Sequence, residues 1–283
     1  MIRDYPCTHL QDGAEVLLEA SLLPVPDIHL YADDMGAFAL EVREKTNAPW
    51  CMLPFCHTVE AETLGAKVRY GDRKNGPRVV DYACSSLDDL LTLPDMDFTQ
   101  GRIAQVLAAC RELHRRGETV ILEITGPFTL LGGLIDPALL FRFLRKEPEK
   151  MEQVFAYLHR NLLAYMQAAQ ESGVSIISYA DPTGGVNIIG PKLAEQMVRS
   201  FTLPLLNGME DRLHPETLVH LCPKTAFALL DTGLAQSTAL PVSAQADYAA
   251  AVLSARGKCR FVGHGCIKNH KFRSNGLNGL TLL

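Results

Sequence analysis

The chain has no segment that approaches the roughly 20 consecutive apolar residues of a membrane-spanning helix. Residues 1–13 lack the succession of charged, apolar and small residues that marks an export signal. Basic residues are not in excess, because 27 Lys and Arg stand against 32 Asp and Glu and give a formal net charge of -5. Nucleic acids and anionic membranes select clustered Lys and Arg. We therefore expect neither as a partner, and we expect a cytoplasmic protein.

The motifs of nucleotide and esterase chemistry are also missing. The sequence has no Walker-type phosphate loop, no Gly-x-Gly-x-x-Gly between an expected strand and helix, and no Gly-x-Ser-x-Gly elbow. Eight cysteines are present, and inside a cell they are expected to stay reduced rather than form disulfides. Five lie among apolar residues and are expected to be inert buried side chains, namely Cys7, Cys51, Cys84, Cys110 and Cys259.

The sequence does contain alternating helical and extended patterns. Residues 14–23 and 33–45 are expected to form N-terminal helices, the second opened by a capping Asp. Residues 69–77 are charged and Gly-rich, which indicates an exposed turn. Further helices are expected at 101–116, 148–172, 191–199 and 244–255, and strands at 48–55, 119–124, 174–179, 218–221 and 260–262.

This alternation predicts a parallel sheet with crossover helices. At 283 residues the chain suits one large domain better than two small ones. The commonest closed form at this length is the TIM-type (β/α)8 barrel. Because fewer than eight strands are convincing, we expect a single α/β barrel over residues 1–283 that is shortened or incomplete, with residues 1–47 as a helical segment leading into it.

The strongest candidate for a metal site is built from one histidine and two cysteines. His220 and Cys222 are alternate residues of an expected strand, which should direct the imidazole and the thiol to one point. Cys266 follows the last expected strand, after glycines that leave room near the backbone. One His and two Cys around a tetrahedral ion, with the fourth position open, is typical of catalytic zinc. His220, Cys222 and Cys266 are therefore the predicted zinc ligands.

A plainer interpretation stays open, since a His-x-Cys pair is common by chance and also suits ordinary half-buried strand positions. His264 stands two residues from Cys266 as well. It suits a ligand, a partner that orients a ligand, or a proton acceptor, and the supporting or structural role is favoured. We count it among the residues that bind substrate or cofactor.

Two carboxylates are candidate catalytic residues. Asp181 follows an expected strand directly, at the start of the turn-forming residues 181–185, which places it at the mouth of a barrel. It either orients substrate or caps the next turn. Glu123 lies inside an apolar strand, where a carboxylate must be neutral, paired or facing water.

A second cluster comprises Cys56, His57, Glu60 and Glu62. Neighbouring residues on a strand point to opposite faces and do not easily chelate one ion. The cluster therefore ranks behind the predicted zinc ligands as a metal site, and we assign it to binding of substrate or cofactor.

Three segments occur in an order that resembles the uroporphyrinogen decarboxylase superfamily. They are LPFCHTVEAETLGA at 53–66, ITGPFTL at 124–130 and DPTGG at 181–185. Within that superfamily, the His220-x-Cys222 pair with the distant Cys266 is similar to the zinc motif of the methylcobamide:coenzyme M methyltransferase branch. The resemblance covers roughly residues 25–270.

The resemblance implies a barrel in which zinc binds the thiol of a small methyl acceptor. The thiolate would attack the methyl group of a methylcobamide, a methylated corrinoid held by a corrinoid carrier protein. A coordinated divalent ion strips the proton from a thiol that is otherwise only a few per cent ionised near neutral pH. The acceptor stays open among coenzyme M, homocysteine, another thiol and a folate, and so does a homo-oligomeric state.

The sequence departs from the family by being short. It lacks a counterpart of the first strand and helix, and the stretch between Cys222 and Cys266 is brief. Two alternatives follow. A tetrapyrrole decarboxylase is disfavoured, because the Arg-rich N-terminal motif of the decarboxylases has no counterpart at residues 22–29. A shortened barrel that binds a corrinoid or its carrier without turnover is the other alternative.

Overall fold

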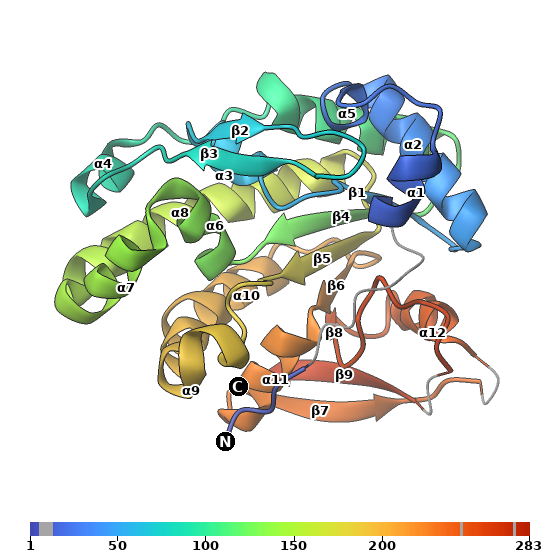
Figure 1. Cartoon of the computed structure of the whole chain (residues 1–283). Coiled ribbons are helices and arrows are strands. Elements are labelled where there is room, and N and C mark those ends of the chain that lie inside the picture. Colours follow the sequence, from blue (N-terminus) through green and yellow to red (C-terminus); the bar gives the residue numbers. More distant parts are fainter. Residues whose placement is uncertain (6–13, 244–245, 274–275) are drawn as a thin grey trace.

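The computed structural model of the chain describes residues 1–5, 14–243, 246–273 and 276–283. This described part is organised around one sheet with the strand order β1-β4-β5-β6-β8-β9-β7 (Figure 1). The strands are β1 (Cys51–Leu53), β4 (Val120–Thr125), β5 (Ile176–Ala180), β6 (Leu218–Leu221), β7 (Ala235–Leu240), β8 (Phe261–Val262) and β9 (Leu277–Leu282).

The sheet is parallel from β1 to β8, and β9 pairs antiparallel with both β8 and β7. Among the described residues it ends at β1 on one side and β7 on the other, so it does not close. The predicted fold class, an α/β barrel that is shortened or incomplete, is confirmed.

Helices cover the sheet on its outer side (Figure 1). They begin and end close to the positions that apolar periodicity predicts, as in α5 and α8. The later helices are α3 (Val59–Thr63), α4 (Leu87–Thr92), α5 (Gly101–Arg115), α6 (Pro127–Leu134), α7 (Pro137–Lys146), α8 (Pro148–Glu171), α9 (Val186–Met197), the π-helical η2 (Val198–Thr202), α10 (Leu203–Glu210), α11 (Pro223–Asp231) and α12 (Tyr248–Ala255).

The central strands are buried on both faces. All six residues of β4 and all five of β5 are buried, as expected for parallel strands between helices and a packed interior. Helix α8 packs the outer face through a stripe that includes Met151, Phe155, Leu158 and Leu162, which follows the helical period. A polar side chain in these strands therefore has no access to bulk water.

The N-terminal segment is helical, with α1 (Ala14–Ala20), the short η1 (Asp27–His29) and α2 (Ala32–Thr46). The expectation that an Asp caps the second helix is wrong. The residue before α2 is Tyr31, and no side chain caps the helix there. Asp33 lies inside the first turn instead, where its charge favours the helix dipole. The predicted turn at 69–77 is confirmed as the hairpin between β2 (Lys67–Arg69) and β3 (Arg78–Asp81).

The two ends of the described chain meet beside α11 and β7 (Figure 1). The Arg3 backbone N–H and guanidinium donate to the carboxylate of Asp231 in α11. The amide of Leu283 donates to the carbonyl of Leu234 at 3.0 Å. Both ends are thereby attached to the same part of the fold.

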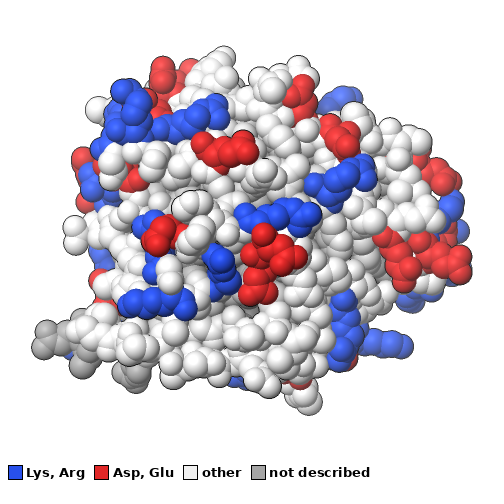
Figure 2. All heavy atoms as spheres, turned by 180° about the vertical axis from the view of Figure 1, so that it is seen from behind, with Lys and Arg blue, Asp and Glu red and all other residues white. Residues whose placement is uncertain are grey.

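On the face shown in Figure 2, blue Lys and Arg side chains are interspersed with red Asp and Glu side chains. Among the described residues no single helix is long and apolar enough to cross a membrane. One bent pair, α6 with α7, meets the length and composition test at an angle of 116°.

Candidate metal and substrate site

Three buried polar residues lie in one row across the sheet. The parallel register places Glu123 of β4 opposite Ser178 of β5, and Ser178 opposite His220 of β6. Side chains at the same level of a parallel sheet share a face. All three are buried, so this row forms a polar layer near the carboxyl ends of the strands, where α/β barrels place their functional groups.

His220 is fixed by contacts to the loop that follows β8. Its Nε2 lies 3.1 Å from the carbonyl oxygen of Gly265 and 3.0 Å from the hydroxyl of Tyr248. A carbonyl oxygen only accepts, so Nε2 carries the proton and Nδ1 presents a lone pair. Nδ1 is buried and has no hydrogen-bond partner among the described residues. Burial lowers the pKa of His220 to about 4, which keeps the ring neutral.

The two candidate thiols lie at the same edge of the sheet. Cys222 follows β6 directly and precedes α11, so it is not an alternate residue of the strand as predicted. Its amide donates to the carbonyl of Tyr179 in the neighbouring strand. Cys266 lies in the loop after β8, and both cysteines are partly buried. The edge therefore carries one imidazole and two thiols from β6 and the β8 loop.

The glycines before Cys266 serve a different purpose from the predicted one. A Cβ at Gly263 would lie 2.5 Å from the carbonyl oxygen of Leu221, and a Cβ at Gly265 would lie 2.9 Å from the Tyr248 ring. The room beside these glycines is filled by protein atoms rather than left for a metal. Glycine is needed there because the loop packs directly on β6 and on the start of α12.

His220, Cys222 and Cys266 are residue types that bind zinc, but they do not lie close enough together to hold an ion. A histidine whose other ring nitrogen donates to a backbone carbonyl is the usual form of a metal ligand, and His220 has that form. Across the described ranges, however, no three His, Cys, Asp or Glu side chains lie close enough together to hold an ion. In this conformation His220, Cys222 and Cys266 therefore do not form a complete metal site.

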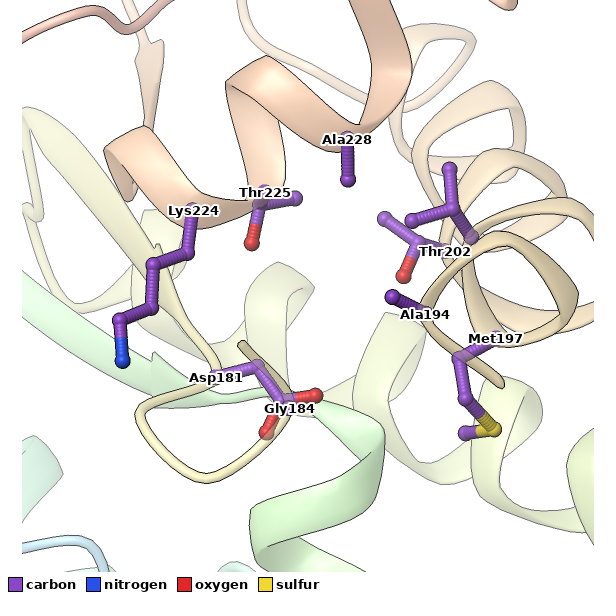
Figure 3. Close-up of a pocket in the computed structure, with 9 residues that line it drawn as sticks. Asp181, Gly184, Ala194, Met197, Thr202, Lys224, Thr225 and Ala228 are labelled. Carbon is purple, nitrogen blue, oxygen red and sulfur yellow. The ribbon is translucent and has the colours of Figure 1, made fainter. Parts of the chain in front are cut away.

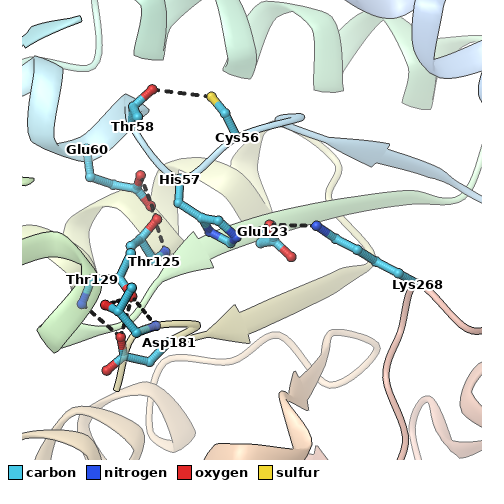
Figure 4. Close-up of polar contacts among 10 residues, drawn as sticks. Cys56, His57, Thr58, Glu60, Glu123, Thr125, Thr129, Asp181 and Lys268 are labelled. Carbon is cyan, nitrogen blue, oxygen red and sulfur yellow. Dashed lines mark hydrogen bonds and ion pairs between the residues drawn. The ribbon is translucent and has the colours of Figure 1, made fainter. Parts of the chain in front are cut away.

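Glu123 is paired with His57 and Lys268 (Figure 4). Its Oε1 lies 3.3 Å from Nε2 of His57 and 3.7 Å from Nζ of Lys268. Its side chain is 5% exposed, against 25% for His57 and 45% for Lys268. Of the three states that the sequence left open for this carboxylate, namely neutral, paired or facing water, the structure shows the paired one. Lys268 brings the loop of Cys266 to the β4 carboxylate.

The second predicted cluster divides into separate contacts. Cys56 and Glu62 both contact the buried Arg102 of α5, whose Nη1 donates to Cys56 Sγ at 3.3 Å and whose Nε pairs with Glu62. Glu60 turns the other way and accepts from the amide and hydroxyl of Thr125 at 2.8 and 3.0 Å (Figure 4). His57 belongs with Glu123, as described above.

Glu60 therefore fastens α3 to the end of β4. Burial raises the pKa of this carboxyl, while the hydrogen bonds from Thr125 oppose the rise. The cluster holds the strand ends together, and only His57 of its four members contacts the polar row.

Asp181 caps a helix that begins more than fifty residues earlier in the chain. Its carboxylate accepts from the amides of Phe128 and Thr129, in the first turn of α6, at 3.0 and 2.8 Å, and from the Thr129 hydroxyl at 2.6 Å. A Cβ at Gly126 would lie 2.4 Å from the Cβ of Asp181. The sequence pattern offered capping of the next turn, whereas the structure shows capping of another helix.

The cavity beside Asp181 is small. It measures about 20 Å³, lies between the Asp181 loop, α9 and α11, and is lined also by Thr202, Lys224 and Thr225 (Figure 3). That volume holds about one water molecule. Burial raises the pKa of the Asp181 carboxyl against the opposing effect of its hydrogen bonds. In this conformation Asp181 supports the strand ends through its contacts to α6.

Comparison with known proteins places the chain in a family. The family model described as uroporphyrinogen decarboxylase (URO-D) matches residues 16–264, and the chain therefore belongs to that family. The resemblance inferred from the three sequence segments is thus confirmed.

Its relatives include methyltransferases. The chain is 26% identical to the methylcobamide:CoM methyltransferase MtbA of Methanosarcina mazei, over 77% of this chain and 65% of the relative. It is 24% identical to the methylcobamide:CoM methyltransferase MtaA of Methanosarcina barkeri, over 80% and 66%. The chain thus spans about two thirds of the length of these relatives. A solved methyltransferase from Methanosarcina mazei shares the fold, with a TM-score of 0.66 at 22% identity, covering 82% of this chain and 69% of that one.

Sequence reasoning missed three residues of this region. Tyr248 contacts His220, Lys268 contacts Glu123, and Arg102 contacts Cys56. A signal existed for Arg102, because it shares a helical face with the apolar Val106 and Leu113 and so had to be buried. Nothing in the sequence joins Tyr248 to His220, which lies 28 residues away.

Proposed function

We propose that this protein is a methyltransferase that moves a methyl group from a protein-bound methylcobamide to a small thiol held by zinc. The observation that carries the proposal is the state of His220, a neutral imidazole whose buried Nδ1 lone pair has no partner among the described residues. Cys222 and Cys266 follow β6 and β8 at the same edge of the sheet. The names of the relatives support the same class of reaction. His220, Cys222 and Cys266 would hold the ion.

Bound zinc would supply the Lewis acidity that lowers the pKa of a coordinated thiol. The protein's own residues would hold the acceptor and take up its proton. The His57–Glu123 pair is suited to the proton, because Glu123 lies in the same row as His220 and is shielded from water. Transfer then forms a sulfur–carbon bond and breaks the cobalt–carbon bond, whose electron pair stays with the corrinoid.

The first test is zinc content, measured by elemental analysis of protein purified under reducing conditions. We expect about one zinc per chain in the wild type and its loss in His220→Ala and in Cys266→Ser. Cys259→Ser is the matched control, because this partly buried cysteine lies just before β8 and its thiol donates to the backbone carbonyl of Ala255. It should keep the zinc.

The same variants are then mixed with methylcobalamin and a thiol, and demethylation is followed by absorbance. Zinc loss and activity loss should coincide, whereas Glu123→Gln should keep zinc and lose about 100-fold in rate or more if it takes up the proton. The proposal would be wrong if the wild type contains no zinc, or if its zinc content is unchanged in both His220→Ala and Cys266→Ser. A decarboxylase-like barrel would then be the remaining interpretation.

A further inference from the structure

The hydroxyl of Tyr248 joins the two halves of the proposed zinc site. Tyr248 is the first residue of α12 and is fully buried. Its oxygen lies 3.0 Å from His220 Nε2 and 3.1 Å from the Gly265 carbonyl oxygen, and it accepts from the Gly265 amide at 3.2 Å. One hydroxyl thus contacts both the imidazole of β6 and the backbone next to Cys266.

These contacts settle the protonation of the histidine. The Gly265 carbonyl faces Nε2, so the proton stays on that nitrogen and the lone pair on Nδ1. The Tyr248 hydroxyl accepts from the Gly265 amide and donates to its carbonyl, which holds that carbonyl in place. Removing the Tyr248 hydroxyl would release the Gly265 backbone. The Gly265 carbonyl orients the His220 imidazole, so the imidazole would lose its fixed orientation as well.

Tyr248 itself is held firmly. The Asp247 carboxylate caps α12 by accepting from the Ala250 amide at 2.8 Å, and the Tyr248 amide donates to the Phe272 carbonyl. The Tyr248 ring stacks on Phe272 with ring centroids 4.7 Å apart. Since the ring is held by packing and the hydroxyl by hydrogen bonds, the two contributions are separable by mutation.

We propose that Tyr248 is a positioning residue for metal binding, which sets the ligand form of His220 and the position of the Cys266 loop together. This inference rests on the proposed zinc site. Nothing in the sequence marks Tyr248 for this role. Its hydroxyl acts through His220 and the Gly265 backbone, and not on the methyl group or the acceptor thiol directly. Its role is to place two ligands, one from β6 and one from the loop after β8.

The test is the zinc affinity of Tyr248→Phe, measured by competition with a chromogenic chelator at fixed pH. Loss of a residue that orients a metal ligand typically weakens binding about 10- to 100-fold, and that range is expected here. Tyr157→Phe is the matched control, since it also removes a buried tyrosine hydroxyl that donates to a carbonyl, that of Pro94 at 2.7 Å, but on α8. Its zinc affinity should equal that of the wild type.

Two outcomes of the zinc measurements distinguish the proposed function from the inference about Tyr248, and hydrogen exchange provides a further test. If the wild type binds no zinc, the proposed function fails. If the wild type binds zinc and Tyr248→Phe binds it equally well, with a wild-type circular dichroism spectrum, the inference about Tyr248 is wrong while the function stands. Hydrogen exchange of the Gly265 amide in the metal-free wild type is a measurement independent of any variant: slow exchange is expected, and exchange as fast as in an open loop would contradict the inference.

Discussion

His29 is a buried histidine that the fold keeps neutral. It is 4% exposed, its Nε2 has no hydrogen-bond partner among the described residues, and its ring meets Phe55 edge-on. Burial, followed by the positive charge of Arg102, lowers the pKa of His29 to about 4. Protonation is therefore much easier in the unfolded chain than in the folded one.

The sign of the pH effect follows from this difference. Above the ordinary pKa of about 6.5 the residue is neutral in both states, and the fold carries no penalty. As the pH falls from about 6.5 toward 4, the unfolded state binds the proton first, and His29 should remove roughly 3 kcal/mol from the free energy of unfolding. Urea unfolding at pH 7 and at pH 4.5 measures the loss. In His29→Leu most of it should disappear.

The exposed His214 provides the control for this experiment. His214→Leu should leave the slope of stability against pH close to that of the wild type. If His29→Leu and the wild type lose the same free energy on acidification, burial of His29 does not destabilise its charged form.

At the scale of elements, the strand ends are held together by buried carboxylates. Glu60 joins α3 to β4, and Asp181 joins the end of β5 to the first turn of α6. Each of these bonds links a segment that follows one strand to a segment at the end of the adjacent strand, and the two segments are far apart in sequence. The contacts of Glu60 and Asp181 therefore stabilise the strand ends that carry the candidate site.

Asp181→Ala should lower the free energy of unfolding by about 2–3 kcal/mol, because two amides and a hydroxyl lose their acceptor in a buried place. The comparison is Asp136→Ala, which removes the partly exposed cap of α7 and should cost about 1 kcal/mol. Thermal and denaturant unfolding give both values.

Turnover of the same two variants separates capping from catalysis. A capping role predicts that Asp181→Ala loses stability first and that the soluble folded fraction keeps its rate per folded molecule within a few-fold. Full stability combined with a large loss of rate would instead make Asp181 a catalytic residue.

At the scale of the whole molecule, the sheet is completed by its last strand. β9 pairs with β8 on one side and, over six residue pairs, with β7 on the other. Leu277 and Leu280 of β9 are buried. Without β9, β7 would lose its partner in the sheet and β8 would keep only β6.

Removing residues 277–283 should therefore abolish stable folding. Burial of two leucines alone contributes about 3–6 kcal/mol, which is comparable to the 5–15 kcal/mol total stability of a typical domain. Circular dichroism melting should lose its cooperative transition. Removal of Leu283 alone is the control. This residue is 60% exposed and contributes one hydrogen bond, from its amide to the Leu234 carbonyl, so its removal should lower stability far less. A truncated chain that still melts cooperatively near the wild-type temperature would show that β9 is dispensable.

Much of this protein was determined by its sequence alone, because local patterns are set by neighbours along the chain. Apolar periodicity placed α5, α8 and the parallel strands, since a helix or strand must bury one face whatever it packs against. The order of three short segments predicted the family. A carboxylate at Glu123 in an apolar strand had to be neutral, paired or facing water, and the structure pairs it with His57 and Lys268.

The tertiary structure decided what depended on residues distant in the chain. β7 carries mainly small or polar residues that are mostly exposed, so no apolar alternation marked it. It belongs to the sheet through its pairing with β9, a strand much later in the chain. Asp181 meets α6, and Tyr248 joins His220 to Gly265, through contacts between segments that only folding brings together. Sequence identifies the groups capable of such bonds, but packing selects which pairs form, because each hydrogen bond requires a fixed distance and direction across the core.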